Sequence, residues 1–285
     1  MSKRDLIAIG RSSIDLYSQD IGVPFKEISG FNAFVGGSPL NISVGCSRLG
    51  LKSTLLTAVG KDKVGEFILN FLNKEKVNTD FIPTKENARS SAVLLGIEPP
   101  DKFPLVFYRD NAADTLINAN DVNNANIANH KVLLVNGTAL NKEPSRDATI
   151  HAIEIAKKNS VSVVMDLDFR ADQWEDYRSF GHVVRSIMSK IDITIGTEEE
   201  VLASMLKDSS QVTIKHQQIS SPEIQGDLNK SIEGLIKLGT GVLIVKRGKD
   251  GASYFDKNFK RRDIKGFPVK ILNVLGAGDA FASGF

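Results

Sequence analysis

Short runs rich in apolar residues alternate along the chain with longer segments of helical periodicity. Six such runs are evident, at residues 6–10, 53–59, 132–136, 161–166, 191–195 and 242–246. They are apolar almost throughout rather than at every second position, which is typical of strands buried on both faces of a sheet. Strands that alternate with helices predict a largely parallel, doubly wound α/β sheet flanked by helices.

Two segments interrupt this alternation and predict a second, smaller sheet. Residues 91–98 and 105–109 are rich in β-forming residues and are joined by a proline-rich loop, so they predict a hairpin. Residues 29–35 predict a further strand outside the main sheet. We therefore expect two lid segments, at about 16–35 and 90–109, that form a small β-sheet over the substrate.

Two polar segments carry no strand signal. The Ser- and Gln-rich segment 207–229 is expected to be a surface insertion, and the basic cluster 260–262 a solvated turn.

Length and composition fit one α/β domain over residues 1–285, and the 41% of hydrophobic residues is too high for a disordered chain. The 36 basic and 34 acidic side chains give a net charge of +2, so charge offers no argument for nucleic-acid or membrane binding. Cys46 is the single cysteine and allows no internal disulfide. No stretch has the length and apolarity of a signal peptide or a membrane span, and we expect a cytoplasmic protein.

The last residues of the chain contain a candidate anion site. Gly276, Ala277 and Gly278 lack bulky side chains, and a helix is expected to open at Ala280. Backbone N–H groups of such a loop can approach an anion closely, and a helix N-terminus favours negative charge. Asp279 would repel a phosphate there unless it had a task, and removing a proton from an attacking hydroxyl is such a task. The alternative is that Asp279 only caps the helix.

Further polar residues follow predicted strands, where ligands gather in an open α/β sheet. Asp15 follows the first strand, either as a ligand of substrate hydroxyls or as a turn residue. Gly36 and Gly37 permit close approach to a ligand, and Asn41 lies in the first turn of the helix predicted over 38–49, with Ser38 as its cap.

The strings G-x-x-x-x-G-K-[ST] and G-x-G-x-x-G after the first strand are both absent. A Walker-type nucleotidase and a dinucleotide dehydrogenase are therefore disfavoured.

The ordered set of motifs resembles the ribokinase, or PfkB-type, family of carbohydrate kinases. The glycine pair before Asn41, the group of Gly60, Asp62 and Gly65, and residues 276–279 occur in the family's order and spacing. The strings at 109–114, 166–170 and 273–279 are most similar to the branch that acts on 5-dehydro-2-deoxygluconate in inositol catabolism.

The resemblance implies a role for each candidate near the sugar. Asp279 would be the catalytic base, and residues 276–278 would form the anion hole for the transferring phosphate. Asp15, Gly36, Gly37 and Asn41 would hold sugar hydroxyls. A sugar acid also needs a cation for its carboxylate, for which Arg109 and Arg170 are the candidates. The alternative is that Arg109 is a surface charge and Arg170 serves only phosphate.

The resemblance also implies an ATP and Mg²⁺ site. Lys246, Gly248 and Gly251 would line or shape the nucleotide site, and Glu199 would act near Mg²⁺ through water. Gly196 stands where the family has the Asn of its N-x-x-E motif, so the metal assignment rests on Glu199 alone. Asn273 and Leu275 replace residues that are often Asp and Thr in the family, which leaves any monovalent-cation site open.

The implied activity is ATP-dependent phosphorylation of a primary hydroxyl of a sugar acid, with 5-dehydro-2-deoxy-D-gluconate converted to its 6-phosphate. Other kinases of the family, for 2-keto-3-deoxygluconate, ribose or fructose, are alternatives, and so is a ligand-binding regulatory protein on the same fold. An exposed lid edge predicts a homodimer through the lid. Because relatives continue with more helix, the sequence ending at Phe285 is expected to be a partial chain.

Overall fold

The computed structural model describes residues 3–99, 103–214, 222–270 and 274–285. Within this part the largest element is an eight-stranded sheet of order β16-β15-β14-β11-β10-β9-β1-β4. The strands from β4 to β14 run parallel, and β15 and β16 are antiparallel additions at one edge. Its members are β1 (Arg4–Ile9), β4 (Ser53–Leu56), β9 (His130–Asn136), β10 (Ser162–Asp166), β11 (Ile193–Thr197), β14 (Val242–Lys246), β15 (Ala252–Asp256) and β16 (Arg261–Ile264).

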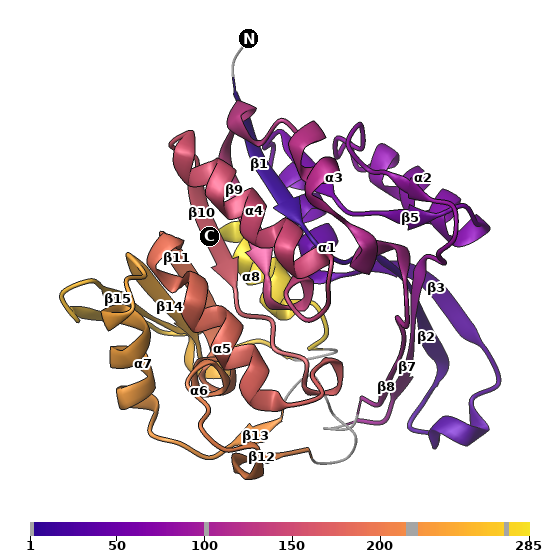
Figure 1. The fold of residues 1–285 in the computed structure, drawn as a ribbon. Helices are drawn as coiled ribbons and strands as arrows, with labels where there is room; N and C mark the ends of the chain where they lie inside the picture. The colour runs from indigo at the N-terminus through magenta and orange to yellow at the C-terminus, as the bar shows by residue number, and fades with distance from the viewer. Residues whose placement is uncertain (1–2, 100–102, 215–221, 271–273) are drawn as a thin grey trace.

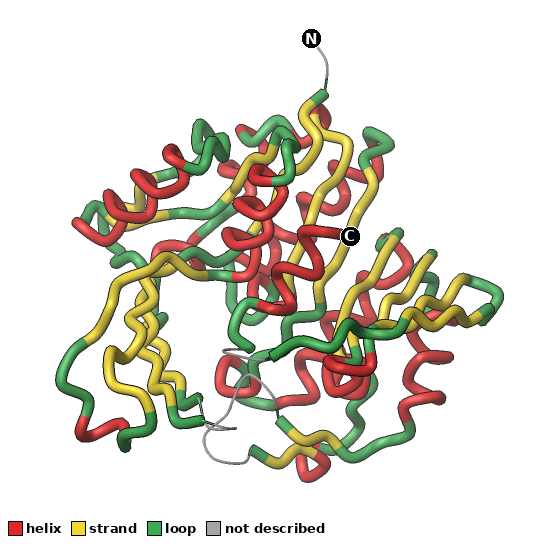
Figure 2. The backbone as a smooth tube through the Cα atoms, turned by 180° about the vertical axis from the view of Figure 1, so that it is seen from behind, coloured by secondary structure: helices red, strands yellow, loops and turns green. Residues whose placement is uncertain are grey.

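Helices cover both faces of this sheet, as the doubly wound prediction requires (Figures 1 and 2). On β1, Leu6 and Ala8 pack on the side of α1 and α2, whereas Ile7 and Ile9 face the core formed with α3 to α7. Burial on both faces explains why the strands are continuously apolar. The helices are α1 (Ser38–Arg48), α2 (Lys63–Lys74), α3 (Ala119–Asn124), α4 (Ser145–Lys158), α5 (Tyr177–Ile187), α6 (Glu198–Ser204), α7 (Leu228–Lys237) and α8 (Ala277–Gly284).

The second sheet predicted from the sequence is present, and we name it the side sheet. It has the order β3-β2-β7-β8, formed by β2 (Ser13–Ile21), β3 (Phe31–Gly36), β7 (Ser91–Ile97) and β8 (Leu105–Tyr108). It projects from the body of the molecule beside the carboxyl end of β1 (Figures 1 and 2). Because β2 begins at Ser13, Asp15 lies within a strand, and its interpretation as a turn residue is wrong.

Several local predictions need correction. Residues 260–262 do not form a solvated turn, because Arg261 and Arg262 begin β16, an edge strand with all side chains exposed. The predicted strand 53–59 ends at Leu56, and Val59 starts the short β5 (Val59–Gly60), which pairs with β6 (Thr84–Lys85).

The segment 207–229 is not wholly a surface insertion. It contains the paired strands β12 (Val212–Thr213) and β13 (Glu223–Ile224), and Ile224 is buried in the main core. Parts of three predictions, in the loop 99–104, in the segment 207–229 and at Asn273, lie outside the described residues.

Candidate active site

The helix that carries Asp279 begins earlier than predicted. Helix α8 starts at Ala277 and is preceded by Gly276 in the left-handed region, with φ of 80°. Gly276 is the N-cap residue, so the interpretation of Asp279 as the cap is wrong. Asp279 lies in the first turn, where a carboxylate interacts favourably with the helix dipole. Its Oδ2 accepts a 2.8 Å hydrogen bond from Nδ2 of Asn41, which lies in the first turn of α1.

Close packing of α1 against α8 fixes this pair of residues. Gly45 of α1 faces Ser283 of α8, and a Cβ at Gly45 would lie 2.6 Å from the Ser283 Cβ. The Ser283 hydroxyl donates to the backbone oxygen of Asp279 at 2.7 Å. Glycine at position 45 therefore lets the two helices approach closely enough for Asn41 to reach Asp279.

Asp15 lies close to this pair at the base of the side sheet. It is buried, and its Oδ1 accepts a 2.6 Å hydrogen bond from Ser13. Burial raises the pKa of Asp15, and the charge of Asp279 adds to this increase. A Cβ on Gly36 would overlap the Asp15 carboxylate, and one on Gly37 would overlap the backbone oxygen of Arg11. The two glycines thus make room for the protein's own groups at this site.

A cluster of charged residues occupies the carboxyl ends of β10, β11 and β14. Lys246 Nζ lies 3.2 Å from Oδ1 of Asp166 and 3.7 Å from Oε2 of Glu200. Arg170 Nη2 lies 2.7 Å from Oδ1 of Asp168. Burial raises the pKa of Asp166 to about 7, with Lys246 opposing the increase. The pKa of Lys246 is raised, because the attraction of Glu200 and Asp166 outweighs its burial.

Lys246 connects this cluster to the start of α8. A Cβ on Gly278 would lie 3.4 Å from Lys246 Nζ, so the ammonium group borders the first turn of the helix. The charge of Asp279 also acts on Asp166 and Arg170. The predicted anion hole and Lys246 are therefore neighbours in the fold.

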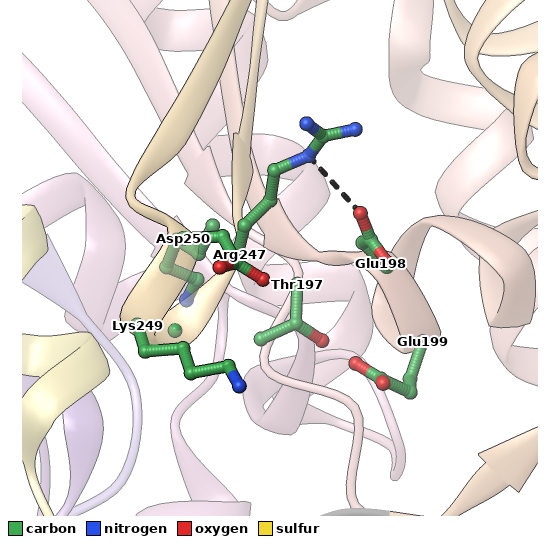
Figure 3. A pocket seen from close by; sticks show the side chains of 8 residues that line it. Thr197, Glu198, Glu199, Arg247, Lys249 and Asp250 are labelled. Carbon is green, nitrogen blue, oxygen red and sulfur yellow. Dashed lines mark ion pairs between the residues drawn. The ribbon is translucent and has the colours of Figure 1, made fainter. Parts of the chain in front are cut away.

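Lys246 also lines an open pocket of about 720 Å³ on the side of α6 and the β14–β15 turn (Figure 3). Figure 3 shows Glu199 on one side of the pocket and Lys249 on the other, with Arg247 paired to Glu198. The lining residues are Thr197, Glu198, Glu199, Lys246, Arg247, Gly248, Lys249 and Asp250. Three of the four predicted nucleotide residues thus meet at one pocket.

Gly251, the fourth, is outside this lining. It adopts a φ of 92°, and a Cβ there would overlap the backbone oxygen of Ile264. Its structural role is therefore the turn between β14 and β15 and the close approach of β16.

Arg109 is not a surface charge, contrary to one of the two interpretations. It is buried and lies 2.6 Å from Asp114 as an ion pair. Its Nη1 donates to the backbone oxygen of Thr138 at 3.0 Å and to Oε1 of Gln173 at 2.7 Å. Its guanidinium is thereby tied to several parts of the protein.

Sequence reasoning assigned no role to Asp166, Asp168, Glu200 or Arg11. The polar end of β10 indicated the first two. In the sequence Glu200 does not differ from its neighbours in an acidic first turn. In the structure it forms the capping box of α6 with the N-cap residue Thr197, and its carboxylate also lies near Lys246.

Two features are absent from the part of the chain that the structure describes. No group of three or more His, Cys, Asp or Glu side chains there converges on a metal position. No helix in the same part of the chain combines the length and apolarity needed to cross a bilayer.

The chain is similar to known carbohydrate kinases in sequence and in fold. The sequence matches the pfkB family of carbohydrate kinases over residues 3–285. It is 34% identical over 284 residues to 5-dehydro-2-deoxygluconokinase of Clostridium beijerinckii, covering 99% of this chain and 80% of that protein. An uncharacterized sugar kinase of Pyrococcus horikoshii, solved in complex with ATP, superposes with a TM-score of 0.79 at 27% identity, covering 98% of this chain and 82% of that one.

The fold extends to more distant kinases. A putative ribokinase II of E. coli, solved with ATP and Mg²⁺, gives a TM-score of 0.80 at 21% identity, covering 99% of this chain and 84% of that one. The predicted ribokinase-like fold is thus confirmed. The chain belongs to the pfkB family of carbohydrate kinases.

Proposed function

We propose that this kinase transfers the γ-phosphoryl group of ATP to the primary hydroxyl of 5-dehydro-2-deoxy-D-gluconate and forms the 6-phosphate. The observation that carries the proposal is the position of Asp279. Its carboxylate accepts a hydrogen bond from Asn41, and the preceding residue, Gly278, borders the Lys246 ammonium group. The name of the Clostridium beijerinckii relative supports this choice of substrate.

Asp279 acts as the general base. Asn41 donates to Oδ2 and so orients the carboxylate, while Oδ1 remains available to accept the proton of the attacking hydroxyl. Asp15 and Asn41, with the backbone at Gly36 and Gly37, hold the other hydroxyls. This division of roles keeps the reacting hydroxyl close to the base and to the anion hole.

The start of α8 stabilises the transferring phosphoryl group. The first N–H groups of a helix have no carbonyl partner within it, so those that follow Gly276 are available for an anion. Lys246 adds a positive charge beside Gly278. Preorganised donors of this kind lower the energy of the charge that develops in the transition state.

The pocket lined by Glu199, Lys246 and Gly248 suits ATP. Its volume of about 720 Å³ is within the usual range of ligand pockets, and Lys246 joins it to the anion hole. Gly248 leaves open space where a Cβ would stand, which permits close approach of a nucleotide. Glu199 offers a carboxylate to the hydration shell of Mg²⁺, an ion that would neutralise charge on the phosphates.

The side sheet serves as the lid. Strand pairing places Asp15, Val93 and Phe107 in one row across β2, β7 and β8, and therefore on one face of the sheet. That face carries the sugar-binding Asp15, so its closure over the substrate would exclude water from the phosphoryl group.

The opposite face of the side sheet supports a homodimer. The row of Leu16, Leu94 and Val106 is apolar, and Val106 and Tyr108 of the edge strand β8 are 40% and 60% exposed. Pairing of two such faces or edges would cover them. Sedimentation of the wild type and of a Val106→Asp variant tests this, since a monomeric wild type would contradict it.

A coupled ADP-release assay tests the proposed activity. The candidates are 5-dehydro-2-deoxygluconate, 2-keto-3-deoxygluconate, fructose and ribose, each with ATP and Mg²⁺. We expect the highest kcat/KM for the first acid. Preference for a neutral sugar would refute the substrate but not the kinase, and ATP binding without turnover of any sugar would favour a regulatory protein.

A further inference from the structure

Arg11 lies in the short connection between the end of β1 at Ile9 and the start of β2 at Ser13, and it is only 9% exposed. Its Nη1 donates to the Ser13 hydroxyl at 3.2 Å, and it makes no ion pair with any described residue. Its Nε is buried and has no hydrogen-bond partner in the described part of the chain. A buried guanidinium with an unused donor is costly to keep unless an anion completes its surroundings.

The other buried cations nearby already have anionic partners. Arg109 is paired with Asp114, Arg170 with Asp168, and Lys246 with Asp166. These pairs are built into the protein before any substrate arrives. Among the described residues at this site, Arg11 is the cation left for an external anion.

Arg11 also lies on the substrate side of the side sheet. Its guanidinium carbon is 5.1 Å from the centre of the Phe107 ring, and Phe107 shares a row with Val93 and Asp15. Ser13, which accepts from Arg11, donates in turn to Asp15. The guanidinium is therefore held between the lid ring and the residues that bind the sugar.

We infer that Arg11 binds the carboxylate of the sugar-acid substrate and so selects acids over neutral sugars. The inference rests on the proposed function and replaces Arg109 and Arg170 as the predicted carboxylate ligands. The Nε–Nη2 edge of a guanidinium matches the two oxygens of a carboxylate, and Phe107 fixes the plane of the group. Closure of the lid would bring the ring and the guanidinium onto the substrate together.

The test compares a sugar acid with its own methyl ester, which has the same hydroxyls and no charge. Arg11→Met keeps the length of the side chain and removes the charge, and Arg11→Lys keeps the charge without the planar fork. Arg48→Met, at an exposed ion pair with Glu75, is the matched control. We expect Arg11→Met to lower kcat/KM for the acid about 10- to 100-fold and to leave the ester within about twofold. Arg11→Lys should fall between wild type and Arg11→Met with the acid.

Equal losses with acid and ester, or no loss with either, would overturn the assignment. Calorimetric binding of the acid and of the ester without ATP gives the same comparison independently of turnover. If Arg11→Met does not fold, Arg11→Lys provides the comparison with wild type. Failure of the proposed function is separable, because it would show in the wild type as a lack of turnover of either acid. Failure of the Arg11 inference alone would leave wild-type acid turnover intact, and the Arg11 variants would keep the wild-type ratio of kcat/KM between acid and ester.

Discussion

Gly36→Ala is the most specific structural perturbation of the sugar site. The backbone of Gly36 is outside the left-handed region, so alanine introduces no backbone strain there. The new methyl carbon would, however, lie well under 3.0 Å from the Asp15 carboxylate. The backbone at both positions is fixed by pairing of β2 with β3, so the Asp15 side chain has to rotate away.

This rotation has two energetic consequences of different size. Loss of the 2.6 Å bond from Ser13 and local overpacking should destabilise the fold by about 1–3 kcal/mol. Loss of each hydrogen bond between the carboxylate and a sugar hydroxyl should cost about 1.5–3 kcal/mol, or roughly 10- to 100-fold in kcat/KM for the sugar. Binding of ATP should change little, because its proposed pocket lies at α6 and β14.

The assay is initial-rate kinetics with the sugar and ATP varied separately, together with a thermal melt. Gly284→Ala is the matched control, because a Cβ there meets no atom within 4 Å. We expect the control to behave as wild type. A Gly36→Ala enzyme with an unchanged KM for the sugar would refute the placement of Asp15 in the substrate site.

Three further predictions follow from the packing and charge of the site. Gly45→Ala should push α8 away from α1 and lower kcat more than about tenfold. Because the clash is with the Ser283 side chain, adding Ser283→Gly should restore part of kcat. A double variant with no restored kcat in steady-state kinetics would contradict this. Lys246→Met leaves Asp166 buried without its cation and should cost about 3–5 kcal/mol in urea unfolding. Adding Asp166→Asn should recover stability but not kcat. Recovery of both would contradict the assignment of Lys246 to the phosphate site. Burial lowers the pKa of His130 below its ordinary value of 6.5, so the unfolded state takes up the proton first as pH falls. The free energy of unfolding should therefore decrease as the pH falls below about 6.5. A His130→Gln protein with an equally steep decrease would disprove this.

The sequence was sufficient where one local property determines the structure. Continuous apolar runs identified the parallel strands, and the proline-rich loop between two β-rich runs identified the hairpin of the side sheet. Strand β16 was missed because an exposed edge strand of charged residues has neither a buried face nor alternation.

The candidate site was predictable as a set of residues but not as a network. Residues at the ends of strands and at helix starts had a geometric reason to meet, and Asn41 and Asp279 do so. The ion pairs could not be predicted from the sequence, since no local sequence feature shows that Asp114 neutralises Arg109. Arg11 was overlooked for the same reason. Among the described residues it has no ion-pair partner and its Nε has no hydrogen-bond partner, which only the three-dimensional arrangement reveals.

Asp279→Asn tests the central claim most directly, because it keeps the shape of the side chain and the first turn of α8 while removing the base. The measurement is ADP formation with saturating 5-dehydro-2-deoxygluconate, accompanied by ATP titration of the same preparations. Since general-base catalysis contributes about 10²–10⁴-fold, kcat should fall by that factor with the affinity for ATP retained. A variant with near-wild-type kcat would contradict the assignment of Asp279 as the base.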